Sequence, residues 1–291
     1  MSGFADFWAG RDLWRDPLIA GVLAGGILGY IGVFVVLKRM VFVSAALSEI
    51  SGVGVAFAFW LGAVLGIDPH AHGATPLLLE PTWFSILFAC AASALFSMRP
   101  SHRKLASETV VGLGYIISSA LVLAILNSPR IVQEAHAVGD ILFGNAVTVP
   151  RKQIEALAIA ALAAVAAHGV FFKELLFVSY DPETALVQGV GVVRYELLLN
   201  LATAVVISVA TRAVGALPVF AFSVLPAAAA LMLTDRMRLT IVLAVAFGAV
   251  SAALGYYVSW VEQLPTGATM VVVASAFLLP GVMKILRRRS V

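Results

Sequence analysis

The stretch VSAALSEISGVGVAFAFWLG, residues 43–62, is long enough to cross a lipid bilayer as a helix and carries Glu49 near its middle. Similar apolar runs recur along the chain of 291 residues, which is 61% hydrophobic and only 12% charged. The mean hydropathy of +1.00 lies far outside the range of soluble globular domains. The chain is therefore predicted to be an all-α integral membrane protein.

The apolar runs predict a polytopic bundle of about nine transmembrane helices, with eight as the alternative count. We expect these helices at residues 17–37, 42–66, 82–98, 107–126, 154–172, 195–212, 215–234, 239–259 and 266–286. The break at 127–153 contains only a short apolar piece, which cannot span a bilayer. Residues 1–291 are expected to form a single transmembrane domain, in which the aromatic residues of 1–16, including Trp14, suit an interfacial helix.

Basic residues flank the apolar runs and form no cluster on a soluble domain, which argues against nucleic-acid binding. More of them lie on the side that includes Lys38, Arg194 and the C-terminal arginines than on the side of Arg151 and Arg212. Because cytoplasmic loops carry the excess of basic residues, the C-terminus is predicted to be cytoplasmic and the N-terminus outside. Cys90 is the only cysteine, which excludes an intramolecular disulfide and a cysteine metal cluster.

The predicted helix around Glu49 has two different faces. Small residues that allow close packing share the face of Glu49, whereas bulky residues suited to lipid lie roughly 100° away: Ile50, Val53, Phe57 and Trp60. Exposing a charge to lipid costs about 2.5–3.5 kcal/mol or more, so Glu49 should point into the bundle or a cavity. We interpret it as a cation or proton site with Ser48 as a candidate helper; the alternative is a structural carboxylate that is protonated or hydrogen-bonded.

Other spans carry packing signals. Gly21, Gly25 and Gly29 recur every four residues, which permits two helix backbones to approach closely. Pro226 removes a backbone hydrogen bond and predicts a kink, either a gating element beside a transport pathway or a simple packing feature. His168 is expected to be a packed, hydrogen-bonded residue and not a metal ligand.

The stretch SYDPETALVQG, residues 179–189, differs from the apolar runs around it. Asp181 suits an N-cap, Pro182 the first helical position and Glu183 the positive end of the helix dipole, while Gly189 suits the C-terminal stop. A helix of about two turns is predicted on the cytoplasmic side. It is well suited to docking a soluble partner, and the alternative is an interfacial connector.

Metal and catalytic motifs are sparse. His70 and His72 lie beside Asp68 in a predicted outer loop, where they form a weak metal-collecting candidate or simply a solvated loop. The chain has no phosphate-binding loop, no H-E-x-x-H helix and no G-x-S-x-G elbow. The chain is therefore not expected to be an enzyme, and any ATP hydrolysis must come from a separate polypeptide.

The order of these stretches resembles the permease family of bacterial ABC importers for zinc, manganese and iron(II). The matching segments are KRMVFVSAALSE, SETVVGLGY, DILFGN, DPETALVQGVGV, VGALPVFAFSVLPAAAALML and GYYVSWVEQLPTGATMVV. The resemblance implies a homodimer in the bacterial cytoplasmic (inner) membrane with a pathway between its two copies. It also implies two cytoplasmic ATPase subunits docked at residues 181–189, including Ala185, and an extracytoplasmic metal-binding protein. No permanently bound cofactor is implied; the cargo is a divalent metal, with zinc first and manganese or iron next.

One departure from the family pattern falls on residues 43–62. Members commonly have an Asp and, four residues later, a His that is thought to contact the metal, and here these positions are Ala45 and Glu49. Carboxylate oxygens suit harder ions, whereas imidazole suits zinc. Glu49 from each protomer could form a two-carboxylate ring. A secondary cation transporter or channel that uses Glu49, and a degenerate permease without metal transport, are the alternative functions.

Overall fold

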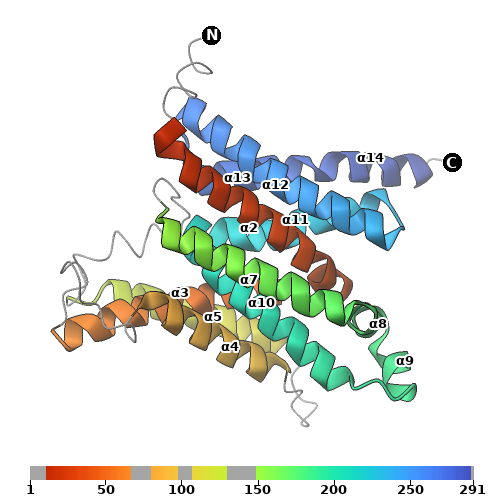
Figure 1. Cartoon of the computed structure of the whole chain (residues 1–291), viewed down its shortest axis with the longest axis horizontal. Helices are drawn as coiled ribbons and strands as arrows, with labels where there is room; N and C mark the ends of the chain where they lie inside the picture. Colours follow the sequence, from red (N-terminus) through yellow and green to blue (C-terminus); the bar gives the residue numbers. More distant parts are fainter. Residues whose placement is uncertain (1–10, 67–79, 98–106, 130–148, 290–291) are drawn as a thin grey trace.

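The computed structural model describes residues 11–66, 80–97, 107–129 and 149–289, and within these ranges every regular element is a helix (Figure 1). In chain order the helices are α2 (Arg11–Leu37), α3 (Val41–Val64), α4 (Pro81–Ser97), α5 (Ser107–Leu126), α7 (Arg151–Val170), α8 (Phe172–Tyr180), α9 (Pro182–Val187), α10 (Val192–Val214), α11 (Ala216–Leu233), α12 (Met237–Glu262), α13 (Thr266–Ala276) and α14 (Leu278–Arg289). A helix satisfies its own backbone hydrogen bonds, as a lipid environment requires. The all-α prediction is confirmed.

All nine predicted spans fall in helices. Eight helical segments of the described chain are long and apolar enough to cross a membrane, and the last of them, Thr266–Arg287, covers α13 and α14 together. The remaining predicted span, 82–98, corresponds to α4. This helix is apolar but has only 17 residues, the lower limit for a span. Both predicted counts are therefore compatible with the structure, and the difference depends on α4 alone.

The N-terminal part of α2 includes the end of the predicted interfacial segment 1–16, whose residues 1–10 lie outside the described residues. Residues 11–16 are continuous with the first span and do not form a separate interfacial segment. The Trp14 side chain is only 5% exposed and belongs to the main hydrophobic cluster of the bundle. Its ring therefore packs against other helices of the bundle.

The long helix α2 lies in the middle of the bundle (Figure 1). It packs most extensively against α12 and α11 and also contacts α10 and α7. A second group, α3, α4 and α5, packs together and is joined to the rest through α10 and α11. The helix that carries Glu49 therefore belongs to this second group and contacts α10 and α11 of the rest of the bundle.

Glycines bring α2 and α12 into backbone contact. A methyl group added at Gly25 would overlap the carbonyl oxygen of Gly248, and one added at Gly29 would overlap that of Ala244. At Gly21 the same methyl group would make only ordinary contacts with Met270 and Ala252. The predicted close approach is confirmed, and we call Gly25, Gly29, Ala244 and Gly248 the glycine seam.

Buried serines join three helices around α3. The Ser51 hydroxyl lies 2.7 Å from that of Ser85 on α4, and Ser85 lies 2.5 Å from the Ser208 hydroxyl on α10. All three side chains are fully buried. Hydroxyl groups that bond across helices stabilise a membrane bundle because lipid offers them no other partner.

The bulky face of α3 differs from the prediction that it faces lipid. The Phe57 ring packs against Phe84 and Phe88 of α4, with ring centroids 5.8 and 5.6 Å away, and stacks on Trp60. Val53 is also buried. Bulky side chains are equally compatible with lipid and with a neighbouring helix, and here α4 covers them.

Charged residues mark the two ends of the bundle. At the start of α2, Asp16 lies 3.4 Å from Arg151 of α7. Directly after the other end of α2, Lys38 pairs with Glu196 of α10 at 3.5 Å. The structure thus separates Arg151 from Lys38 as the sequence predicted, although it does not identify the membrane side of either end.

Candidate functional site

Helix α3 places Glu49 in an open cavity of about 510 Å³. The cavity lies between three helices and is lined by Phe42, Ala45, Ser48 and Glu49 of α3, Tyr115 of α5, and Ala216, Leu217 and Phe220 of α11. Ala45 precedes Glu49 by about one helical turn and Ser48 is its immediate neighbour, and both are small enough to leave space beside the carboxylate. The prediction that Glu49 points into the bundle or a cavity is confirmed.

One polar side chain from the neighbouring helix α5 bonds to Glu49, and the Ser48 hydroxyl beside it is engaged elsewhere. The Ser119 side chain of α5 forms a hydrogen bond with the Glu49 carboxylate, which is half-buried. Ser48 is buried and donates its hydroxyl hydrogen to the Ala45 carbonyl at 2.8 Å. Its oxygen can therefore offer only lone pairs to a cation. Glu49 is thus a half-buried carboxylate held by one neighbour, and Ser48 is at most a weak additional ligand.

The site is poor in ligands for a single chain. Among the residues that the structure describes, no group of three or more His, Cys, Asp or Glu side chains could hold a metal ion. Ala45 contributes only a methyl group to the cavity wall. His70 and His72 lie outside the described residues, so their prediction stays untested. The described residues of one chain supply a cavity with one carboxylate and no closed coordination shell.

The short helix α9 forms where the sequence places it. Asp181 is its N-cap and accepts hydrogen bonds from the Thr184 backbone N–H at 3.0 Å and the Thr184 hydroxyl at 2.6 Å. These bonds, the hydroxyl bond first, lower the pKa of the Asp181 carboxyl below its ordinary value. Pro182 begins the helix, and Gly189 follows it with a φ of +80°, a left-handed conformation that glycine adopts readily.

The faces of α9 have different roles. Glu183, Thr184, Leu186 and Val187 are exposed, whereas Ala185 is fully buried against Val178 and Val192. The expectation that Ala185 belongs to a contact surface is therefore corrected. Ala185 anchors the helix to α8 and α10, and the exposed residues on either side of it are the ones available to a partner.

Pro226 lies buried in α11, the helix that supplies Leu217 and Phe220 to the Glu49 cavity. The residues around it contact α2 closely, since a methyl group at Gly32 would overlap the Ser223 carbonyl oxygen. Proline also lacks the N–H that would bond to the preceding turn. Both the gating role and the simple packing role stay predictions.

His168 is packed as expected but lacks the expected hydrogen bond. Its ring is fully buried against Tyr30 and Phe34 of α2, with centroid distances of 5.6 and 5.3 Å. Neither ring nitrogen has a hydrogen-bond partner among the described residues. The aromatic neighbours supply no acceptor in this arrangement, which the sequence could not indicate.

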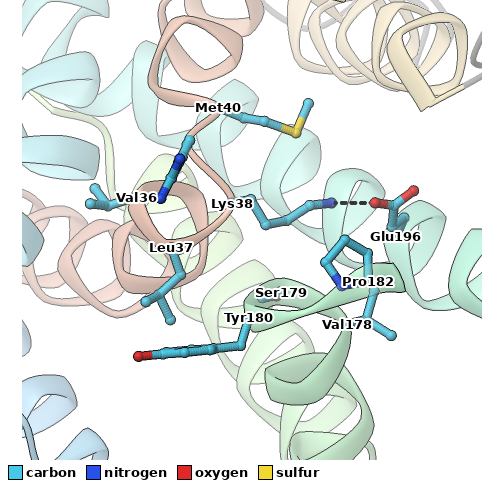
Figure 2. Close-up of a pocket in the computed structure, with 10 residues that line it drawn as sticks. Val36, Leu37, Lys38, Met40, Val178, Ser179, Tyr180, Pro182 and Glu196 are labelled. Carbon is cyan, nitrogen blue, oxygen red and sulfur yellow. Dashed lines mark ion pairs between the residues drawn. The ribbon is translucent and has the colours of Figure 1, made fainter. Parts of the chain in front are cut away.

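Sequence reasoning did not identify Lys38 and Glu196 as a pair. They lie far apart in the chain and meet beside a cavity of about 540 Å³ behind α9 (Figure 2). Lys38 was interpreted only as an orientation signal, and Glu196 falls near the start of an apolar run. An acid in such a run was the signal that could have indicated a partner.

Comparison with known proteins decides the family. The family model described as "ABC 3 transport family" matches residues 11–285. The chain belongs to this family. It is a multi-pass membrane permease with the all-helical fold of that family.

Individual relatives cover nearly the whole chain. The manganese transport system membrane protein MntC of Listeria monocytogenes is 30% identical over 261 residues, which are 90% of this chain and 86% of the relative. A Haemophilus influenzae protein named "Probable iron transport system membrane protein" is 28% identical, over 92% of this chain and 88% of the relative. The solved structure of PsaBC from Streptococcus pneumoniae in complex with Fab superposes with a TM-score of 0.79. It covers 96% of this chain and 95% of that one at 24% identity, and therefore supports the fold alone.

Proposed function

We propose that this chain is the membrane permease subunit of an ATP-binding cassette importer that moves a divalent transition metal ion into the cytoplasm. The observation that carries the proposal is Glu49, a carboxylate inside a membrane helix that lines an open cavity. Carboxylates in such positions commonly mark ion pathways. Glu49 also occupies the position at which the family pattern has its metal-contacting histidine.

Manganese, with iron(II) next, is the proposed cargo. The relatives described above are named for manganese and iron, and the expectation of zinc first is not confirmed by them. Carboxylate oxygens suit manganese better than they suit zinc, which prefers imidazole and thiolate ligands. Since one chain offers one carboxylate, two copies facing each other supply the second one. Such a ring of acidic side chains favours cations over anions and binds them weakly enough for release.

The energy source is a pair of separate ATPase subunits that dock on α9. Its exposed residues Glu183, Leu186 and Val187 are available at the surface, while Asp181 and Ala185 hold the helix in place. This assignment puts the end with Lys38 and the C-terminus in the cytoplasm and the N-terminus outside, in a bacterial inner membrane. A metal-binding protein delivers the ion at the outer end.

In the proposed alternating-access cycle, the permease binds the cation and the ATPase subunits supply the movement. Glu49 attracts the cation and partly replaces its water shell, with Ser48 as a weak helper. ATP binding and hydrolysis in the partner subunits move α9 and change the side from which the cavity is open. A secondary carrier has no need of a capped docking helix such as α9, so this alternative is disfavoured.

A degenerate permease without metal transport is the second candidate, because Ala45 cannot coordinate a metal. The test uses the complete complex of permease, ATPase and binding protein in proteoliposomes, with Mn²⁺, Fe²⁺ and Zn²⁺ supplied separately. The proposal predicts ATP-dependent uptake of Mn²⁺ above the other two ions. Metal-independent ATP hydrolysis with no uptake of any of the three would support the degenerate permease instead.

A further inference from the structure

A buried ion pair lies directly behind the docking helix α9. The Lys38 Nζ is 3.5 Å from a Glu196 carboxylate oxygen, and the two side chains are only 7% and 11% exposed. Both line the cavity of about 540 Å³ that also includes Tyr180 at the end of α8 and Pro182 at the start of α9 (Figure 2). The pair therefore joins the α2–α3 connection to α10 at the end of the bundle where α9 lies.

On one side this pair is connected to α9 by a packed cluster. Ala185 of α9 is fully buried against Val178 of α8 and Val192 of α10. The Val190 N–H also donates a hydrogen bond to the Ala185 carbonyl at 3.0 Å, which ties the start of α10 to α9. Glu196 lies one helical turn after Val192 and thus on the same face of α10. A displacement of α9 must move this face.

On the other side the pair is connected to the helix that carries Glu49. Residues 38–40 are the whole connection between α2 and α3, and Arg39 within it has a φ of +57°. The Met40 N–H donates to the Val35 carbonyl and the Val43 N–H to the Met40 carbonyl, so the connection has little slack. Glu49 lies eight residues after the start of α3, about 12 Å along the helix.

We propose that the Lys38–Glu196 ion pair is a positioning pair that couples movement of α9 to α3 and so to the cavity around Glu49. Neither residue touches the cargo. Their contribution is to make α10 and the start of α3 move as one unit when the ATPases displace α9. This inference rests on the proposed docking role of α9 but not on the identity of the metal.

The decisive variant replaces both charges, Lys38→Met with Glu196→Gln. Removing one partner of a buried pair leaves an uncompensated charge and is strongly destabilising, whereas replacing both is much better tolerated. The exchange Lys38→Glu with Glu196→Lys restores a pair in the opposite direction. Arg151→Met is the matched control, because it breaks the exposed ion pair with Asp16 at the opposite end of the bundle.

The readout is nucleotide-dependent labelling of a reporter cysteine in the assembled transporter. Cys90→Ser removes the chain's only cysteine, and Ala45→Cys places a thiol in the wall of the Glu49 cavity. With the native pair, labelling by a membrane-permeant thiol reagent should differ at least about five-fold between the nucleotide-free and ATP-bound complexes. The variant Lys38→Met with Glu196→Gln, called the double-neutral variant, should lose this difference while it still hydrolyses ATP. The variant Lys38→Glu with Glu196→Lys should regain part of the difference. Arg151→Met should behave like the parent.

A full nucleotide response in the double-neutral variant, at equal ATPase assembly, would overturn the inference. Uptake of Mn²⁺ is measured on matched complexes that keep Ala45 and Cys90, because a thiol at position 45 would add a metal ligand to the Glu49 cavity. If the complex with the native ion pair responds to nucleotide in the Ala45→Cys background but the matched complex with Ala45 moves no metal, the proposed cargo is contradicted and the coupling pair stays supported. Mn²⁺ uptake that is unchanged per ATP hydrolysed in the double-neutral variant contradicts the coupling pair and leaves the proposed function supported.

Discussion

The glycine seam and the Glu49 cavity are both built from small residues on membrane helices, yet they have opposite outcomes. In the seam, Gly25 meets Gly248 and the two backbones touch. In the cavity, Ala45 faces Leu217 and Phe220 of α11 across open space. A small-residue face therefore permits close packing but does not by itself produce it. The residues on the partner helix decide whether the space closes or stays open for a solute.

The largest expected effect is on the seam. Gly25→Ala places a methyl group onto a backbone carbonyl that no side-chain movement can relieve, so the helices must separate. Overpacking of this kind typically costs about 1–3 kcal/mol, occasionally more. We expect Gly25→Ala to lower the thermal unfolding temperature of the purified permease and its abundance in the membrane.

Gly26→Ala is the matched control on the same helix. Its added methyl group would lie 3.7 Å from Val245, an ordinary contact, so stability should stay close to that of the parent. Equal loss of stability in the two variants would show that the cost does not come from the contact with Gly248 and would remove the distinction between the seam and its surroundings.

A second prediction converts the cavity to the common family pattern. Ala45→Asp with Glu49→His supplies a carboxylate and an imidazole one turn apart, a ligand pair that favours zinc. We expect Zn²⁺ uptake relative to Mn²⁺ to rise by roughly ten-fold, at the low end of what metal contacts contribute. The measurement is competition between the two ions in proteoliposomes. An unchanged ratio would mean that these two positions do not set selectivity.

Much of the helical framework could be predicted from the sequence because it depends on local rules. Apolar runs of span length become helices wherever the backbone must bond to itself, and the cap of α9 needs only residues 181–189. The prediction that Phe57 faces lipid was wrong, and the sequence did not indicate that the Trp14 ring packs against other helices, for a common reason. A bulky residue in a membrane protein can meet lipid or another helix, and only the tertiary arrangement decides which.

The candidate site was predictable in part for the same reason. The small face around Glu49 indicated its direction, but the cavity depends on Tyr115 and Phe220, which come from distant segments. Glu196 in an apolar run indicates that a partner exists, but no local pattern identifies Lys38 as that partner, since the two residues lie in distant segments of the chain. Contacts between distant segments are set by packing and not by periodicity.

A smaller effect is expected at α9. Asp181→Ala removes both bonds to Thr184 and frays the first turn, so association of the ATPase should weaken by less than about ten-fold. Asp181→Asn is the control, because asparagine is an equally good N-cap. Co-purification of the ATPase with each variant measures the effect. If Asp181→Asn loses as much ATPase association as Asp181→Ala, the negative charge of Asp181 matters and its N-cap hydrogen bonds do not.

The pH dependence of this cap follows from the lowered pKa of Asp181. The Asp181 carboxyl has a lower pKa in the folded helix than its value of about 3.9 in the unfolded chain, so its charged form stabilises the helix at any pH above about 3.9. This stabilisation is lost as the pH falls through the folded pKa. ATPase association should therefore be insensitive to Asp181 between pH 6 and 8. A parent-specific change in that window, absent from Asp181→Asn, would contradict this account.

The most direct test of the central claim compares two glutamates on membrane helices. Glu49 lines the cavity, whereas Glu155 of α7 is exposed away from it. At matched membrane abundance, Glu49→Gln should lower Mn²⁺ uptake at least roughly ten-fold, the usual cost of losing even an indirect metal contact. Glu155→Gln should transport like the parent. Equal uptake by Glu49→Gln and the parent would show that the carboxylate in the cavity is not on the metal's path.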